Sequence, residues 1–281
     1  MDNAAAGIVF GLLSALTWGA GDFSGGVATR RSRAVLVLLV TEISGLIALL
    51  LVAVALKDPW PDAQALAWGA AAGVAGAIGL GALYSGLARG AAALVAPVSA
   101  VVAAALPALV TITTDGLPNE LRLLGFGLAL LGVWLVSRQP DAAQGRAGLG
   151  LGLIAGAGFG LFFVVLDLAQ AGESAVWPIV AARIVATVLV ATVLVAQRAP
   201  VGIGRTALGI ALVAGLLDAG GNLFFALSAR AGRLDVAAVL SSLYPGVTVL
   251  LARVLQRAQI APVQWVGLVA ALAAIGLIAG S

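Results

Sequence analysis

The sequence contains no cysteine and no histidine, and only 10% of its 281 residues are charged. Without cysteine and histidine, the chain cannot form disulfides, use a thiol nucleophile or a histidine proton relay, or supply the usual ligands of transition metals. Lysine is scarce too, since Lys57 is the only one, and no Walker A sequence is present to hold a nucleotide. We therefore expect no metal, no cofactor and no enzymatic activity, and an energy source other than nucleotide hydrolysis.

Hydrophobic residues make up 62% of the chain, which is too many for a soluble body of this size to cover with polar surface. The apolar runs are about 18–24 residues long, enough for helices that cross a hydrocarbon core of about 30 Å, and about twice the length of a barrel strand. We therefore predict an all-α membrane protein embedded in a lipid bilayer. Its ten transmembrane helices are expected near residues 5–27, 34–56, 64–88, 90–112, 120–137, 147–168, 175–196, 206–228, 234–253 and 262–280.

The chain repeats itself with an offset of 141 residues. The matched positions are Gly7 with Gly148, Gly11 with Gly152, Gly19 with Gly160, Gly79 with Gly220, Arg89 with Arg230 and, after a one-residue slip, Gly125 with Gly267. Because each copy holds five spans, the second copy must cross the bilayer upside down relative to the first. Inverted repeats are typical of secondary transporters, whose binding sites lie between the repeats near the midplane. We divide the chain into a first five-helix repeat at 1–138, a connecting loop at 139–144 and a second, inverted five-helix repeat at 145–281.

The basic residues are distributed unevenly between the two sides of the predicted bundle. Ten follow odd-numbered spans, four lie on the opposite side, and one is inside a span. The ten are Arg30, Arg31, Arg33, Arg89, Arg138, Arg146, Arg198, Arg205, Arg253 and Arg257, the four are Lys57, Arg122, Arg230 and Arg233, and the one is Arg183. Because cytoplasmic loops carry the excess of basic residues, the count predicts that both termini face away from the cytoplasm. The high pI is then a sign of orientation, and we expect no nucleic-acid partner.

Glycine is abundant, with 37 residues, and it recurs every fourth position in two symmetry-related rows. One row consists of Gly148, Gly152, Gly156 and Gly160, and the other of Gly7, Gly11, Ala15 and Gly19. Such rows let helix backbones approach closely. Two interpretations stay open, namely plain packing or a sliding seam between the halves that is formed by Gly11, Gly19, Gly152, Gly156 and Gly160.

Glu42 and Arg183 lie in the middle of otherwise apolar spans and are related by the 141-residue offset. Each lies about eight residues, or about 12 Å, into its span, and since the repeats are inverted both are expected near the midplane. A lone charge there costs about 2.5–3.5 kcal/mol on insertion scales. The two residues either neutralise each other as an ion pair or flank a cavity and present opposite charges to a polar or zwitterionic substrate, and these interpretations are compatible.

Two aspartates also lie within spans. Asp218 is central and suits a proton-coupling group, whereas Asp22 is close enough to the arginine-rich end of its span to pair with Arg30 or Arg31. Three further carboxylates lie near span ends, where we expect water to reach them: Asp167, Glu173 and Asp235. Helix breaks are expected at Pro97, Pro107 and Pro245.

Aromatic side chains near these charges are candidates for the lining of a cavity. Trp18 and its repeat mate Phe159 are two of them, and Tyr84 and Tyr244 are others. Together with the charges, they give the predicted substrate-binding set: Trp18, Glu42, Tyr84, Phe159, Arg183, Asp218, Asn222 and Tyr244.

Several motifs resemble those of the drug/metabolite transporter superfamily, in particular its EamA-type permeases. They are Leu16-Thr17-Trp18-Gly19, Leu87-Ala88-Arg89-Gly90 followed by Val95-Ala96-Pro97, Ser241-Ser242-Leu243-Tyr244-Pro245, and Gln264-Trp265-Val266-Gly267-Leu268. The resemblance covers essentially the whole chain and implies a permease or exporter of small metabolites, such as amino acids or drug-like solutes, in a bacterial cytoplasmic (inner) membrane. It also implies a central cavity between the halves, termini in the cytoplasm and arginine in the second span, where this chain has Glu42. We expect a small-molecule substrate, protons as possible coupling ions, and a monomer or weak homodimer.

Parts of the sequence also match two other classes of function. An intramembrane aspartyl protease would use the GxGD-like sequence ending at Asp22 and the tripeptide Pro107-Ala108-Leu109. Such an enzyme needs a second catalytic carboxylate, usually in a Tyr-Asp pair, and the sequence has no Tyr-Asp. A passive channel or facilitator stays open, since a polar path through ten helices need not be coupled to a gradient.

Overall fold

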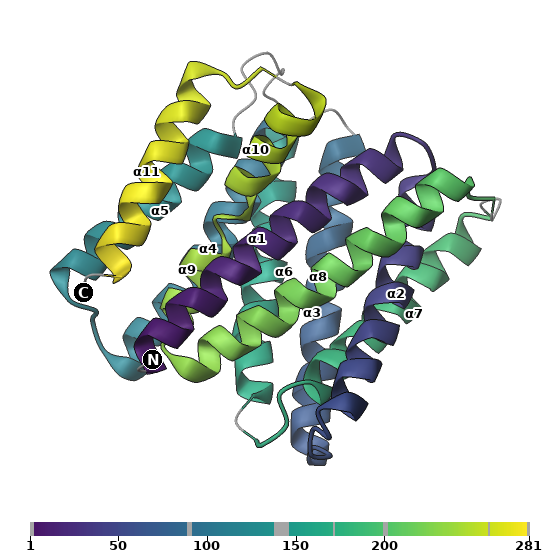
Figure 1. Ribbon diagram of the computed structural model, residues 1–281, viewed down its shortest axis with the longest axis horizontal. Helices are drawn as coiled ribbons and strands as arrows, with labels where there is room; N and C mark the ends of the chain where they lie inside the picture. The colour runs from purple at the N-terminus through teal and green to yellow at the C-terminus, as the bar shows by residue number, and fades with distance from the viewer. Residues whose placement is uncertain are drawn as a thin grey trace.

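A computed structural model describes residues 3–88, 92–137, 146–170, 172–198, 202–257 and 259–279. These residues form eleven helices and no strand, arranged as one bundle (Figure 1). The helices are α1 (Asn3–Thr29), α2 (Ala34–Ala55), α3 (Ala63–Ala88), α4 (Ala92–Asp115), α5 (Glu120–Ser137), α6 (Arg146–Ala169), α7 (Trp177–Ala196), α8 (Arg205–Ala231), α9 (Leu234–Ser241), α10 (Tyr244–Gln256) and α11 (Pro262–Ala279). Ten segments are long and apolar enough to cross a membrane, so the predicted all-α membrane fold is confirmed. The predicted connecting loop at 139–144 lies outside the described residues.

The ninth predicted span is a pair of helices, α9 and α10, that meet at Ser242 and Leu243. Pro245 lies in the first turn of α10 and has no amide hydrogen, so it cannot continue the hydrogen bonds of α9. The other two predicted breaks are wrong, because α4 runs through both Pro97 and Pro107 without interruption. Of the three prolines, only Pro245 therefore lies at a helix break.

The two halves are related by an inverted pseudo-twofold symmetry. Gly125 of α5 faces Ala274 and Ile278 of α11, and its repeat mate Gly267 of α11 faces Gly132 and Val136 of α5. Ala274 and Ile278 are the repeat mates of Gly132 and Val136, so the two contacts are equivalent under this symmetry. Early residues of α5 meet late residues of α11, so the mated helices run antiparallel, which requires the symmetry axis to lie in the membrane plane.

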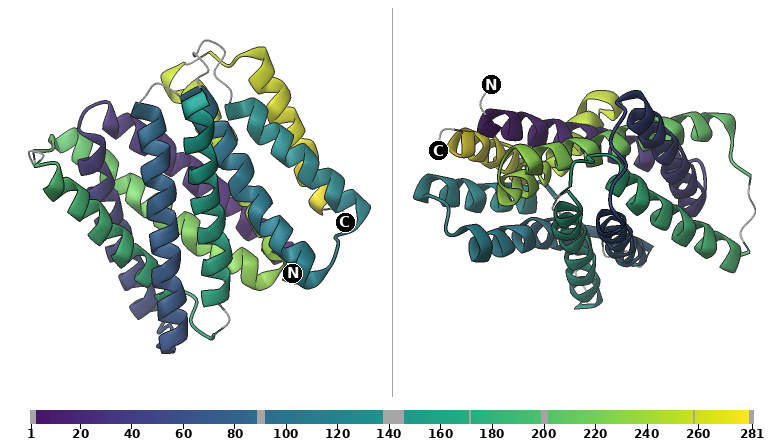
Figure 2. Two further views of the ribbon diagram at one scale, coloured as in Figure 1. Left: turned by 180° about the vertical axis from the view of Figure 1, so that it is seen from behind. Right: turned by 90° about the horizontal axis from the view of Figure 1, so that it is seen from below.

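Helices of the two halves interleave and do not form separate bodies. α1 packs along α8, and its mate α6 packs along α3, as the front and back views show (Figures 1 and 2). The α1–α8 contact is fixed by hydroxyl groups, since Ser14 donates to the Gly221 carbonyl at 2.9 Å and Ser228 donates to the Gly7 carbonyl at 2.7 Å. α2 contacts its own mate α7 at one side of the bundle (Figure 1). The interface between the halves is thus the core of the protein.

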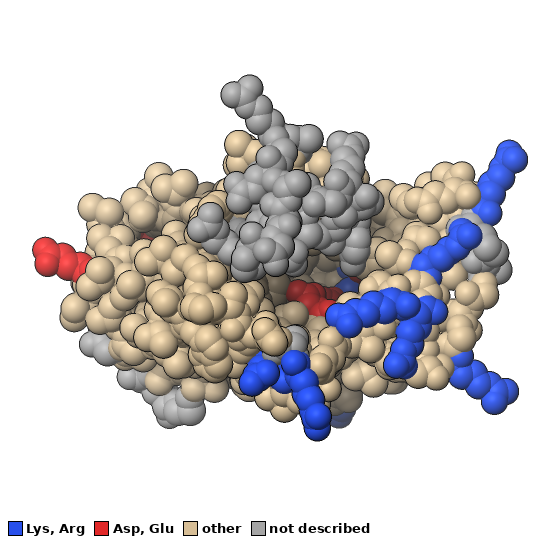
Figure 3. All heavy atoms as spheres, turned by 90° about the horizontal axis from the view of Figure 1, so that it is seen from above, with Lys and Arg blue, Asp and Glu red and all other residues tan. Residues whose placement is uncertain are grey.

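The bundle has two chemically different ends. The terminal side holds Asn3, Ala279 and the connections that follow α2, α4, α6 and α8 (Figure 1). The arginine-rich side holds the connections that follow α1, α7 and α10, with Arg30, Arg31, Arg198 and Arg257 among its cations. Figure 3 views this second side and shows basic side chains gathered on one half of the face, with an acidic side chain recessed beside them.

Candidate functional site

Three charged side chains from three helices meet at the centre of the bundle. Arg183 of α7 donates through Nη1 to Glu42 Oε2 of α2 at 2.7 Å, and through Nη2 to Asp218 Oδ2 of α8. The side chains of Arg183 and Glu42 are only 6% and 9% exposed, whereas that of Asp218 is 33% exposed. Glu42 and Arg183 are thus an ion pair, and Arg183 shares its charge with a second carboxylate. Neither Glu42 nor Arg183 is left with an unpaired charge to offer a zwitterion in this structure.

Small residues bring these three helices close enough for the charges to meet. A Cβ added to Gly45 of α2 would lie 3.0 Å from the Gly215 carbonyl oxygen and 3.3 Å from the Arg183 guanidinium carbon. Gly215 of α8 in turn lies against the backbone of Thr41. Asn222, one turn beyond Asp218, donates to Asp218 Oδ2 at 3.2 Å and to its carbonyl oxygen at 2.9 Å. The second carboxylate is therefore held from two sides.

Asp22 of α1 lies beside this cluster and not with the arginines near the end of its helix. No hydrogen bond or ion pair joins Asp22 to Arg30 or Arg31, and Arg30 donates to Gln256 instead. Gly21 packs against the backbone of α8 at Asp218, and Asp22 interacts electrostatically with both Asp218 and Tyr244. Asp22 is exposed, so it lies on an open part of the interface and not inside the packed core.

The open part of α1 continues from Asp22 toward the arginine-rich side. A Cβ added to Gly25 or Gly26 would meet no atom within 4 Å. Residues three and four positions apart share one face of a helix, so Asp22, Gly25 and Gly26 form a single uncovered strip. A shallow pocket between the ends of α1 and α10, lined by Phe23, Val27, Arg30, Arg31, Leu255 and Gln256, lies on another face of α1 and does not include Asp22. Figure 3 shows an acidic side chain recessed in the arginine-rich face, and the exposed carboxylates of this site are Asp22 and Asp218, so we infer that the site is reached from this side.

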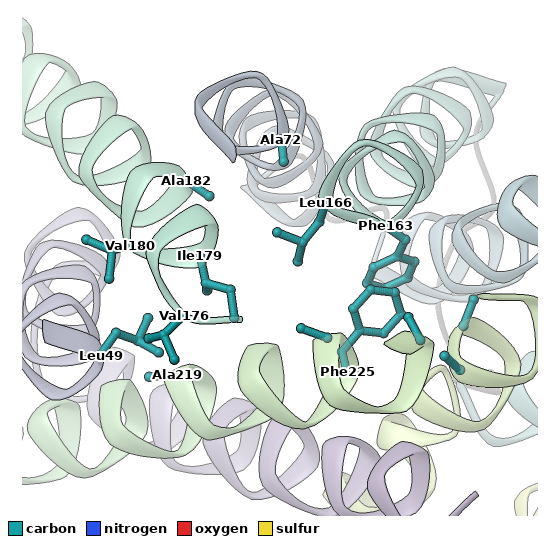
Figure 4. Packing of buried hydrophobic residues seen from close by; sticks show 14 of the residues in the cluster. Leu49, Ala72, Phe163, Leu166, Val176, Ile179, Val180, Ala182, Ala219 and Phe225 are labelled. Atoms are coloured by element: carbon teal, nitrogen blue, oxygen red, sulfur yellow. The ribbon is translucent and has the colours of Figure 1, made fainter. Parts of the chain in front are cut away.

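An aromatic cluster closes the interface below the charges, toward the terminal side. The Trp18 ring lies 5.6 Å from Phe163, 5.9 Å from Phe225 and 6.4 Å from Tyr244, between ring centroids. Phe163 and Phe225 stack on each other at 4.6 Å (Figure 4). Leu166 of α6 and Ile179 of α7, which are almost fully buried, extend this packing farther toward the terminal side. The charged cluster is therefore separated from the terminal side by a dense apolar layer.

On the terminal side, hydrogen bonds join the two halves of the protein. The Asp58 carboxylate, in the connection after α2, accepts hydrogen bonds from Ser174 Oγ at 2.6 Å and from the amides of Ala175, Val176 and Trp177 at the start of α7. Burial acts to raise the pKa of Asp58, but these four hydrogen bonds outweigh it, and its pKa lies below the ordinary value. Asp58 is thus an N-terminal cap supplied by the opposite half.

Arg230, at the end of α8, fastens the same region from another direction. Its guanidinium donates to the carbonyl oxygens of Glu173 at 3.1 Å, Gln170 at 3.1 Å and Ser174 at 2.7 Å, and also to that of Gly172. The connection between α6 and α7 is therefore held by a cation of α8 and by the carboxylate of Asp58. We refer to Asp58, Arg230 and their partners in this connection as the terminal clamp.

Both glycine rows contact a helix of the opposite half. On α1, Gly11 faces Leu240 of α9, and a Cβ added to Gly19 would lie 2.5 Å from the Val247 Cβ of α10. On α6, added Cβ atoms would lie within 2.5–2.9 Å of α4, from Gly152 to Val98, from Gly156 to Val102 and from Gly160 to Leu106. The rows do not face each other, and each leaves no room for a side chain. Whether they slide stays a prediction.

The predicted binding residues fall into three groups. Glu42, Arg183, Asp218 and Asn222 meet at the centre, and Trp18 and Tyr244 lie together beside Asp22. Phe159 is apart from them and packs over Gly79 of α3. The side chain of Tyr84 lies outside the described part of the chain.

Sequence reasoning also missed or misplaced several residues. Asp22 lies at the cavity but was absent from the predicted set, although its position one turn beyond Trp18 on the same helix face was a signal. Phe163 was missed because nothing in the sequence separates it from ordinary core. The expectation of a solvated Asp235 is wrong. Its side chain is fully buried, because Arg233 binds it at 2.9 Å and the Val236 amide donates to it at 2.7 Å.

Comparison with known proteins gives one family and one fold. Residues 146–280 match the model of the "EamA-like transporter family". No curated protein matches the chain. A solved structure titled "Crystal structure of protein" superposes with a TM-score of 0.74, covering 97% of this chain and 96% of that chain at 18% sequence identity. At this identity the likeness shows that the two proteins share a fold.

Proposed function

Residues 146–280 match the model of the EamA-like transporter family, as the sequence motifs predicted, and from this match we propose that the protein is a secondary-active transporter that works by alternating access. Ten apolar spans and the family match make it a multi-pass membrane transporter of small solutes. The proposed solutes are small metabolites such as amino acids or drug-like compounds, moved outward across a bacterial cytoplasmic membrane. The first half repeats the second with an offset of 141 residues, which supports the same proposal for the residues before 146.

One observation carries the proposal: the symmetry mates Glu42 and Arg183 meet at the interface of two inverted halves, with access from one side only. Asp22 and Asp218 are reached from the arginine-rich side, while the aromatic cluster and the terminal clamp lie toward the terminal side. A midplane site that is open to one side and closed to the other is the geometry that alternating access requires. A passive channel instead needs a path open at both ends at once.

The test is transport by the purified full-length chain in proteoliposomes, against a panel of metabolites, with and without a pH gradient. A carrier predicts saturable flux that is accelerated by the same solute on the opposite side of the membrane. Arg183→Gln should abolish the flux, and Arg205→Gln, which removes an exposed arginine at the start of α8, should leave it unchanged. Flux that rises linearly with concentration, without acceleration from the opposite side, would assign the protein to channels. No flux of any solute would contradict the proposal.

A further inference from the structure

The centre of the membrane holds more negative than positive charge. Away from the ends of the spans, the sequence places three carboxylates, Asp22, Glu42 and Asp218, against one guanidinium, Arg183. An uncompensated charge is expensive at this depth unless a partner of opposite sign is supplied. Arg183 is already engaged by Glu42 and Asp218, so it cannot also neutralise Asp22. The cluster therefore needs one more positive charge, which either a proton or a cation can supply.

Asp22 is the carboxylate at which this positive charge is missing. Among the described residues it makes no hydrogen bond or ion pair, whereas Glu42 and Asp218 are both held by Arg183. It is exposed at the cavity, on the uncovered strip of α1 that continues through Gly25 and Gly26. A positively charged group could bind this exposed carboxylate without breaking a hydrogen bond or ion pair.

Aromatic rings beside Asp22 indicate what kind of cation fits. Trp18 lies one turn below it on the same face of α1, and Tyr244 of α10 packs edge-on to Trp18. Ring faces attract ammonium groups and also cover the apolar part of an organic molecule. Metal ions instead require several oxygen ligands, and the described residues contain no group of three acidic or other ligating side chains that could hold one.

We propose that the cavity binds a small organic cation, whose ammonium group is held by Asp22 and whose apolar part lies against Trp18 and Tyr244. The proposal rests on the proposed function in taking this cavity as the substrate site, and it narrows the substrate class. A carboxylate on the same molecule finds no free guanidinium here, because Arg183 is engaged on both sides. Amines without a carboxylate therefore fit better than amino acids do.

The test compares three probes of one shape on the detergent-solubilised full-length chain, using calorimetric titration. Phenethylamine is cationic at neutral pH, 2-phenylethanol is neutral and phenylacetate is anionic. We expect phenethylamine to bind at least about tenfold tighter than 2-phenylethanol, which is the scale of one hydrogen bond to a charged group, and phenylacetate not to bind. This comparison needs no variant, so it stays decisive even if a substitution prevents folding.

Variants then locate the site. Asp22→Asn should remove the preference for phenethylamine, and Asp22→Glu should keep it. Asp167→Asn is the matched control, because Asp167 of α6 lines a different pocket at the terminal side, with Thr111, Thr114 and Asp115. Equal affinity for phenethylamine and 2-phenylethanol overturns the proposal, as does an unchanged preference in Asp22→Asn that elutes as a single species.

Failure of this inference can be told from failure of the proposed function. If the protein transports a neutral or anionic metabolite in proteoliposomes but does not bind phenethylamine, the proposed function is supported and the cation site is contradicted. If phenethylamine binds through Asp22 but no solute of the panel crosses the membrane, the cation site is supported and the proposed function is contradicted.

Discussion

Glu42 and Arg183 occupy equivalent positions in the two inverted halves, and they bind each other across the interface between those halves, with 2.7 Å between Oε2 and Nη1. A pair of this kind ties α2 to its own symmetry mate α7. Asp218 makes the arrangement unequal, because it adds a second carboxylate to Arg183 from α8. The three residues should therefore respond to substitution as a unit.

The first prediction concerns these charges. Arg183→Gln should destabilise the protein most, by about 3–5 kcal/mol, because two carboxylates lose their partner. Glu42→Gln should cost less, since Asp218 still neutralises Arg183. The double variant Glu42→Gln with Arg183→Gln should recover only part of the loss, and adding Asp218→Asn should recover more. Thermal unfolding in detergent ranks the four proteins. Equal losses in both single variants, adding up in the double variant, would show that the charges act independently.

The second prediction concerns the glycine rows. Gly156→Leu should abolish transport, because the new side chain has no space beside Val102 and must force α6 away from α4. Gly150→Leu is the matched control on the same helix, since a Cβ at Gly150 meets no atom within 4 Å. Solute flux in proteoliposomes measures both. Normal transport by Gly156→Leu would contradict the close packing of this interface.

The third prediction concerns the terminal clamp. Asp58→Ala should lower stability by about 1 kcal/mol, the usual cost of losing an N-cap, because the amides of Ala175 and Val176 lose their acceptor and that of Trp177 keeps only Ser174 Oγ. Glu173→Ala serves as the control, since Glu173 gives Arg230 only its carbonyl oxygen and its side chain is exposed. The midpoint of thermal unfolding in detergent should fall for the first variant and stay near wild type for the second.

The pH dependence of this effect has a definite sign. The pKa of Asp58 is lower in the folded protein than in the unfolded chain, because its hydrogen bonds favour the carboxylate over the acid despite partial burial. Its contribution is therefore complete above the ordinary aspartate pKa of about 3.9 and is lost as the pH falls below it. The stability difference between wild type and Asp58→Ala should narrow over that range. If the stability difference instead widens on acidification, folding raises the pKa of Asp58 and the prediction is wrong.

The fourth prediction concerns orientation in the membrane. The excess of arginine predicts that the connections at 30–33 and 138–146 face the cytoplasm. The chain has no cysteine of its own, so single cysteines can report the side. In intact cells, Ser32→Cys should resist a membrane-impermeant thiol reagent, and Leu117→Cys on the opposite side should react. The reverse pattern would place both termini in the cytoplasm, as the resemblance to EamA-type permeases implies.

Much of the fold could be predicted from two features of the sequence. The apolar runs predict where the spans lie, and the odd number of spans in each copy predicts that the second copy is inverted. The break before Pro245 could not be distinguished from the uninterrupted passage of α4 through Pro97 and Pro107. Proline in the interior of a helix removes one backbone hydrogen bond, and the packing around it decides whether the helix ends there.

The site was predicted in part for a similar reason. The repeat relates Glu42 to Arg183, so their approach across a twofold axis follows from their positions in the sequence. Asp218 and Asp22 obey no such relation. Their proximity depends on how closely α1 and α8 approach at Gly21, and that distance is a property of three-dimensional packing.

The sequence repeats the arginine of the terminal clamp, as Arg89, but not its carboxylate. The position that repeats Asp58 is occupied by Ala199, which carries no carboxylate. A transporter built from two copies of one unit would have two end states of equal free energy if the copies were identical. Here one end state gains the Asp58 hydrogen bonds and its mirror image cannot. The empty protein should therefore rest with its cavity facing the arginine-rich side, and the return of the unloaded carrier to that side should be favoured without any energy from the solute.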